Sequence, residues 1–360
     1  MSIADAGDPK APGQAQPVSF PFILHVGFLG CIVFSWTPIT TIWLTGAYND
    51  TDDAMRMVQV RDWMAGQGWY DLRALRLDPP AGVLMHWSRV VDIPVAGLIR
   101  LFGLVADQET AERLARIVFP LSLQALLLLG AGLSGRLLAG PMGGMLAIFL
   151  VIASGMSLGQ FIPGRIDHHA PQIVLLSFMT WACLCGLDPQ RAPMAGLAGV
   201  FAALSLAIAI ENLPFIMALM VVYPIAWAAQ GAPLRAALAW LGLGFAASLT
   251  LFYALFQSPA LWGVHVCDAL SVPHLRAALA GGGAMVLLAA YDRWRKPLLS
   301  QRMLAMAAAG LLAAPPLLLD RQCYLDPFNG LDPLVREFWL SHVQEALSIP
   351  QLLAAHPEGF

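Results

Sequence analysis

Long apolar blocks dominate this chain and restrict the folds that it can adopt. Each is near the length of about twenty residues that an α-helix needs to cross the hydrocarbon core of a bilayer. Hydrophobic residues make up 58% of the sequence and charged residues 12%, whereas a soluble domain has about half and a quarter. The sequence therefore predicts an all-α, polytopic transmembrane helical bundle. The blocks lie near residues 20–44, 90–105, 114–134, 138–157, 171–187, 194–210, 213–229, 236–256, 277–291 and 301–319.

The second block differs from the others. It is short, and it carries Asp92, Pro94 and Arg100. These features favour a helix that lies in the membrane interface over one that spans the membrane. About nine spans then remain, and the first external loop is long and contains this interfacial helix.

The distribution of positive charge supports this count. With nine spans, the connections on one side carry Arg136, Arg191, Arg235 and a basic group between residues 293 and 302. An excess of arginine and lysine is typical of cytoplasmic loops. A tenth span would move Arg136 to the opposite face and break this asymmetry.

The nine-span topology divides the chain into three regions. Residues 1–19 are expected to be a disordered cytoplasmic tail, 20–319 the transmembrane domain, and 320–360 an external C-terminal segment. We expect a multi-pass protein of the plasma membrane, the inner membrane of a bacterium, with a periplasmic C-terminal tail.

Three carboxylates, Asp50, Asp52 and Asp53, follow the first span on the external side. Clustered carboxylates repel one another unless a cation or a basic partner offsets their charge. Arg56 is within reach if this stretch is helical. The cluster is either a site for a hard cation such as Mg²⁺ or Mn²⁺, a general base, or a solvated loop with an incidental ion pair.

An Asp-His-His run, Asp167, His168 and His169, lies between two spans. Pro171 restricts the preceding residue to extended geometry, so Asp167 and His169 are expected to point to the same side and to share a ligand. Ionisable groups at membrane depth are costly and usually functional. Arg165 is a candidate for holding a phosphate.

Two further external features stand out. Glu211 and Asn212 interrupt an apolar run, either as a short turn or with Glu211 as a substrate-facing carboxylate. Cys267 and Cys323 both fall on the external side, where the compartment is oxidising, and we expect them to form a disulfide.

Several classes of protein are disfavoured. The net charge of −3 gives no basic surface for nucleic acid. The sequence contains no Walker loop, dinucleotide fingerprint, nucleophile-elbow serine or cysteine zinc site. A membrane carrier or lipid-binding protein without chemistry remains an alternative to an enzyme, although such transporters usually show related halves.

The order of these motifs resembles the GT-C superfamily of polytopic glycosyltransferases, and most closely the catalytic subunit of oligosaccharyltransferases. That family places an acidic residue after the first span and an arginine nine positions later, as Asp52 and Arg61 are placed here. Its second acidic motif is matched by Gly164, Asp167 and His169.

A third motif of the family, Val-x-Glu in its fifth external loop, is similar to the stretch from Val343 to Glu345. The family's soluble C-terminal domain and its Trp-Trp-Asp-Tyr-Gly motif have no counterpart in this sequence. We expect that a partner subunit supplies this domain.

The resemblance implies an enzyme that moves a sugar from a polyprenyl-phosphate or polyprenyl-pyrophosphate donor, in the membrane lipid, to an acceptor on the periplasmic face. It further implies dependence on a divalent metal, Mg²⁺ or Mn²⁺. The implied metal ligands are Asp52, Asp167, His168 and His169. The implied catalytic residues are Asp52, Asp53 and Glu345, and the implied substrate- or phosphate-binding residues are Arg61, Arg165, Glu211 and Arg336.

Overall fold

The computed structural model describes residues 19–326, 328, 330–343, 350, 351 and 354, except the side chains of residues 156 and 157. Nearly the whole of the expected N-terminal tail, residues 1–18, lies outside the described residues. Helices make up most of the described chain, and its only sheet is a hairpin of two short strands. The predicted all-α helical architecture is confirmed.

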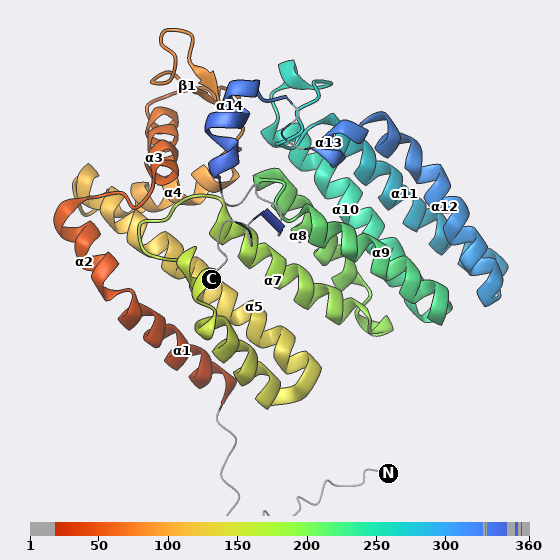
Figure 1. Ribbon diagram of the computed structural model, residues 1–360. Coiled ribbons are helices and arrows are strands. Elements are labelled where there is room, and N and C mark those ends of the chain that lie inside the picture. The colour runs from red at the N-terminus through yellow and green to blue at the C-terminus, as the bar shows by residue number, and fades with distance from the viewer. Residues whose placement is uncertain (1–18, 327, 329, 344–349, 352–353, 355–360) are drawn as a thin grey trace, which may run out of the picture.

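Figure 1 shows the elements in their order along the chain. They are α1 (Phe20–Phe34), α2 (Trp36–Thr45), α3 (Thr51–Met64), β1 (Arg73–Ala74), β2 (Val83–Leu84), α4 (Arg89–Phe102), α5 (Gln108–Ala153), α6 (Gly155–Gly159), α7 (His169–Gly186), η1 (Pro189–Arg191), α8 (Pro193–Ile208), α9 (Leu213–Gln230), η2 (Ala232–Leu234), α10 (Arg235–Phe256), η3 (Pro259–Leu261), α11 (Val272–Arg295), α12 (Leu299–Leu319), α13 (Arg321–Leu325), α14 (Pro333–Phe338) and η4 (Leu340–His342).

Six of the described helices are long and apolar enough to cross a membrane. The pair α1 and α2, bent by 51°, makes a seventh if it forms one span. The apolar α8 is shorter, and α5 is interrupted by non-helical backbone at Ala139 and Gly140. The protein is thus a multi-pass helical bundle, while the count of about nine spans stays a prediction. The second apolar block forms α4, which is not among the candidate spans.

Close packing of α8, α10 and α11 forms the centre of the largest buried cluster. Glycines allow these helices to approach, because a Cβ atom on Gly244 of α10 would collide with the backbone of Gly196 on α8. In the same way, a Cβ on Gly242 would collide with the backbone of Gly282 on α11. Small residues at such crossings are typical of helices that pack in membranes.

The non-helical and amphipathic segments gather at one end of the bundle, at the top of Figure 1. We call this the polar end; it comprises α3, the β-hairpin, α4, α13 and the connections 160–168, 209–212 and 257–271. The connections at residues 187–192, 231–234 and 296–298 lie at the opposite end. The segments that carry residues 50–53, 165–169 and 211–212 therefore lie at the same end of the fold.

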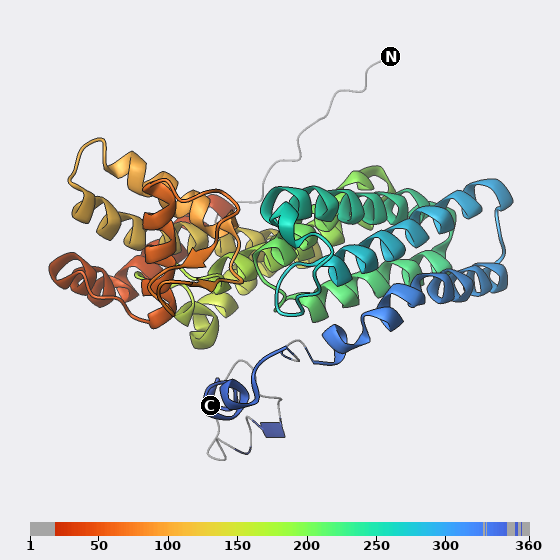
Figure 2. The same ribbon diagram turned by 90° about the horizontal axis from the view of Figure 1, so that it is seen from above.

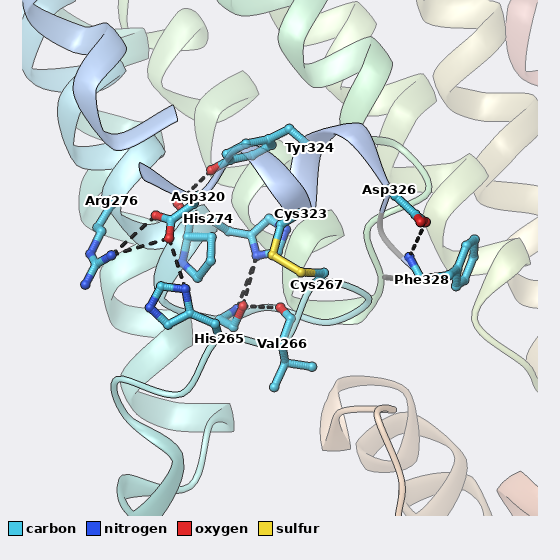
Figure 3. The surroundings of a disulfide bond; sticks show 12 residues. His265, Val266, Cys267, His274, Arg276, Asp320, Cys323, Tyr324, Asp326 and Phe328 are labelled. Atoms are coloured by element: carbon cyan, nitrogen blue, oxygen red, sulfur yellow. Dashed lines mark hydrogen bonds and ion pairs between the residues drawn. A yellow bond between two sulfur atoms is a disulfide. The ribbon is translucent and has the colours of Figure 1, made fainter. Parts of the chain in front are cut away.

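A disulfide joins Cys267 to Cys323, as predicted, and fastens α13 to the 257–271 connection (Figure 3). Asp320, at the start of α13, lies 3.0 Å from His265 Nδ1 and also accepts hydrogen bonds from Arg276. These contacts hold the beginning of the C-terminal segment against the polar end.

Candidate functional site

The N-terminus of α3 places the acidic cluster at the polar end. The carboxylate of Asp50 caps this helix by accepting a hydrogen bond from the backbone N–H of Asp52 at 2.9 Å. Asp53 is fully buried and accepts a hydrogen bond from the backbone N–H of Ile166 at 2.7 Å. The side chain of Asn49 donates to the carbonyl of Pro163 at 2.9 Å. The start of α3 is therefore fixed to the segment that contains the Asp-His-His run.

Asp52 is the half-buried carboxylate of this group, and among the described residues it makes no hydrogen bond or ion pair through its side chain. Burial and the nearby charge of Asp50 raise the pKa of Asp52, while His168 and His169 act in the opposite direction. Burial also raises the pKa of Asp53, to about 7, against the hydrogen bond from Ile166. Asp52 is thus the carboxylate available for a ligand.

The Asp-His-His run leads directly into a helix, which corrects the prediction of extended geometry. Helix α7 begins at His169, and its third residue is Pro171. Proline is tolerated there because the first turn of a helix leaves its N–H groups without intrahelical partners. Asp167 accepts a hydrogen bond from the backbone N–H of His169 at 3.0 Å and is also bound by the guanidinium of Arg165. Asp167 therefore orders the helix start, and the imidazole of His169 faces elsewhere.

Both imidazoles face Glu211, in the turn between α8 and α9. His168 Nε2 lies 2.9 Å from one carboxylate oxygen, and His169 Nδ1 lies 3.1 Å from the other. The side chain of Gln172 donates a hydrogen bond to Glu211 at 2.9 Å. Burial acts to raise the pKa of Glu211, but the hydrogen bonds and charges of the two histidines lower it overall. We call these three ionisable residues, His168, His169 and Glu211, the His-His-Glu cluster.

The His-His-Glu cluster has the composition and the size of a metal site. One donor atom from each residue lies within 4.8 Å of the other two. Among the described residues, the buried Nδ1 atom of His168 has no hydrogen-bond partner. Imidazole nitrogens with a carboxylate suit Mn²⁺ or Zn²⁺, whereas Mg²⁺ prefers oxygen ligands. The donor set therefore fits a transition metal better than Mg²⁺.

Two hollows are lined by residues close in sequence or in packing to this cluster. An open groove of about 550 Å³ is formed by α4, α5, α7 and α8, and nearly all of its lining is apolar, Pro171 included. A cavity of about 320 Å³ lies between the segment 70–88, the ends of α8 and α10, and the 257–271 connection. Ile208 lines both. The ring of Trp87 packs between two imidazoles. Its centre lies 5.7 Å from the ring centre of His86, which lines the cavity, and 6.0 Å from that of His168.

Three other predicted residues lie outside this group. Arg61 donates to Glu112 of α5 at 2.9 Å. Arg336 pairs with Asp326 at 2.6 Å within its own segment, and α14 stands apart from the bundle in Figure 2. Glu345 lies outside the described residues.

A buried charge network behind the site was not predicted. Asp92 of α4 is fully buried and lies 3.0 Å from both Arg56 of α3 and Arg89 of its own helix. Gln59 donates to the same carboxylate at 2.8 Å. Arg56 thus pairs with Asp92 rather than with the acidic cluster. The sequence feature that could have predicted this network is Asp92 itself, because a carboxylate within an apolar block needs a charged or hydrogen-bonding partner.

Comparisons with known proteins identify the fold. No protein-family model and no curated protein matches the chain. A solved structure described as the archaeal oligosaccharyltransferase AglB from Archaeoglobus fulgidus, in complex with an inhibitory peptide and a dolichol-phosphate, matches with a TM-score of 0.61 and 14% identity. The match covers 87% of this chain and 39% of that one.

Two further structures of the Archaeoglobus fulgidus oligosaccharyltransferase also match. The apo form has a TM-score of 0.59 at 15% identity, with 87% of this chain and 39% of that chain covered. The complex with Zn and sulfate has a TM-score of 0.57 at 15% identity, with 89% and 42% covered. The chain spans about two fifths of the length of these relatives. At this level of identity the likeness shows the fold alone: this chain shares the fold of part of these oligosaccharyltransferase chains.

Proposed function

We propose that the protein is a membrane glycosyltransferase that moves a sugar from a polyprenyl-phosphate or polyprenyl-pyrophosphate donor to an acceptor on the periplasmic face. One observation carries this proposal: the His-His-Glu cluster neighbours an apolar groove through Pro171 and, through the ring of Trp87, a cavity that His86 lines together with other polar and apolar residues. A lipid-linked sugar has the same division, with an apolar chain, a charged phosphate and a polar head.

The groove suits the lipid chain. Its lining includes Val90 and Leu98 of α4, Leu123 of α5 and Val174 of α7. Since Pro171 lies in the same lining, two residues after His169, a chain held there carries its phosphate towards the cluster. The dolichol-phosphate of the archaeal complex is a lipid of the same chemical kind.

The His-His-Glu cluster is proposed to hold a divalent metal, Mn²⁺ or Zn²⁺, with Asp52 beside it. When bound, this ion offsets the charge that develops on the departing phosphate. Arg165 binds Asp167 through Nε and Nη2, and its Nη1 lies 3.8 Å from Asp50. A phosphate oxygen that binds Arg165 would share this guanidinium with the two carboxylates. The roles of Arg61, Arg336 and Glu345 stay predictions.

The chemical step is a displacement at the anomeric carbon of the donor. The acceptor atom forms a bond to that carbon while the bond to the phosphate oxygen breaks and its electron pair stays on the phosphate. Asp52 accepts the acceptor's proton or orients it, and Asp53 supports Asp52 from the same helical turn.

The orientation in the membrane follows from charge. Arg191, Arg235 and the basic group around Lys296 lie at the end opposite to the site. Positive residues favour the cytoplasmic side, which turns the polar end to the periplasm. A carrier with this topology would bind the donor without cleaving it.

The test is cleavage of a labelled donor, with water as the slow acceptor. Purified protein in liposomes receives polyprenyl-phosphate N-acetylglucosamine, and free polyprenyl phosphate is measured with Mn²⁺ or with EDTA. We expect release only with metal, and a loss of at least about 100-fold in Asp52→Asn. The control is Asp78→Asn, which replaces an exposed carboxylate in the turn between β1 and β2. This variant should retain full activity.

Two results would contradict this proposal. Full activity in Asp52→Asn would remove that residue from the chemistry. Saturable donor binding by the wild-type protein, without any metal-dependent release, would favour the carrier.

A further inference from the structure

None of the three residues of the His-His-Glu cluster lines the cavity of about 320 Å³ at the polar end, and no residue of that cavity has yet been given a ligand contact. Its size is within the range of small-molecule sites. Its walls come from segments far apart in the sequence: the stretch 70–88, the ends of α8 and α10, the 257–271 connection and Leu331. A hollow assembled in this way is a candidate binding site.

Two ionisable side chains of the cavity lack partners. Within the described part of the chain, neither His86 nor Asp268 makes a hydrogen bond or an ion pair through its side chain. Burial lowers the pKa of His86, against the opposing effect of the charge of Asp268, and the ring of His86 packs beside that of Trp87 with 5.7 Å between the ring centres. An imidazole and a carboxylate that are left unbonded in a cavity are available to hydrogen-bond a ligand.

The rest of the lining combines apolar faces with further polar groups. Phe256 and Tyr70 supply aromatic surface, and Gln257 and Ser258 supply an amide and a hydroxyl. The hydroxyl of Tyr70 is directed to the carbonyl of Ala254 at 3.2 Å. Aromatic rings therefore line the cavity beside groups that donate and accept hydrogen bonds.

We propose that this cavity binds a sugar ring, with Asp268 and His86 as its polar contacts. A pyranose has hydroxyl groups around its edge and C–H groups on its faces, and both parts match this lining. The carboxylate of Asp268 can accept hydrogen bonds from two hydroxyls, while His86 accepts or donates one. The ring belongs either to the donor head or to a glycan acceptor; this choice rests on the proposed function.

The wall that carries Asp268 is held in place covalently. Asp268 follows Cys267, whose disulfide to Cys323 ties this connection to α13 (Figure 3). Val266, which precedes Cys267, lines the cavity and accepts a hydrogen bond from the hydroxyl of Ser271. The disulfide therefore holds the segment that contributes Asp268 to the cavity lining, to which the first loop contributes His86.

Sugar binding is tested without donor and without metal. Saturation-transfer NMR of the purified full chain in nanodiscs measures the binding of methyl glycosides of glucose, galactose, mannose and N-acetylglucosamine. We expect saturable binding of at least one glycoside, at least tenfold weaker in Asp268→Asn and in His86→Ala. Asp78→Asn removes a carboxylate outside the cavity lining and should bind like wild type. No binding to wild type, or equal binding to Asp268→Asn, overturns the proposal.

Kinetics assign the source of the sugar. A raised KM for donor hydrolysis in Asp268→Asn places the donor sugar in the cavity. Unchanged hydrolysis with reduced transfer to a glycan acceptor places the acceptor there. Unchanged rates in both reactions would overturn the assignment.

His168→Ala separates this inference from the proposed function. It should lose donor cleavage and keep glycoside binding. If the wild-type protein binds glycosides but cleaves no donor, the proposed enzymatic activity is refuted and the proposed sugar site is retained.

Discussion

At the scale of single residues, the site depends on charges that only other parts of the fold can balance. Asp92 is fully buried between Arg56 and Arg89, both of which are only 1% exposed. The guanidinium of Arg56 also lies 4.5 Å from the ring centre of Trp87, the residue between the cavity and the cluster. This network joins α3 to α4 and fixes Trp87, so it supports the site without contacting a substrate.

Asp92→Asn leaves two buried arginines without a counter-ion. We expect a loss of about 3–5 kcal/mol in the free energy of unfolding, because breaking a buried ion pair strands a charge. Chemical unfolding in detergent, followed by circular dichroism, measures it. Glu109→Gln breaks an exposed pair with Arg113 and should cost less than about 1 kcal/mol; an equal, small effect of both variants would contradict this view of Asp92.

Glu211→Gln removes the one carboxylate of the His-His-Glu cluster. We expect the affinity for Mn²⁺ and Zn²⁺ to fall by at least about tenfold, since an amide is a poor substitute for a charged ligand. Isothermal titration of metal into the metal-free protein measures this change. The exposed Glu337→Gln is the matched control. Unaltered affinity in Glu211→Gln would place the metal elsewhere.

At the scale of elements, sequence patterns predicted which segments are helical better than where they begin. Asp92, Pro94 and Arg100 marked α4 correctly as different from the spans. The prediction of extended geometry before Pro171 was wrong, because a proline is tolerated in the first turn of a helix and α7 already begins at His169. The rotation of the histidines towards Glu211 follows from this turn and was not predictable from spacing alone.

Gly244→Val tests the packing of α10 against α8. The new side chain must displace the backbone of Gly196, so we expect a loss of about 1–3 kcal/mol in the free energy of unfolding. The same unfolding assay applies. A Cβ at Gly281 of α11 meets nothing within 4 Å, so Gly281→Ala should be neutral or stabilising. Similar stability of the two variants would show that α8 and α10 do not need this close approach.

At the scale of the whole molecule, the sidedness of loops was the most informative property of the sequence. It predicted that Asp52, the Asp-His-His run and Glu211 share one end, and that Cys267 and Cys323 meet. It did not predict the cavity, because only the folded chain brings the stretch 70–88, which contains His86, together with the 257–271 connection, which contains Asp268. Partners so distant in sequence leave no periodic signal in a single chain.

The central claim is that a lipid phosphate reaches the His-His-Glu cluster through the groove between α4, α5 and α7. A benzophenone-bearing polyprenyl phosphate, cross-linked by light in liposomes and mapped by mass spectrometry, tests it directly. We predict adducts on groove residues such as Leu98, Leu123 and Val174, which unlabelled polyprenyl phosphate abolishes. Competed adducts only on the apolar pocket between α9, α11 and α12 would contradict the claim.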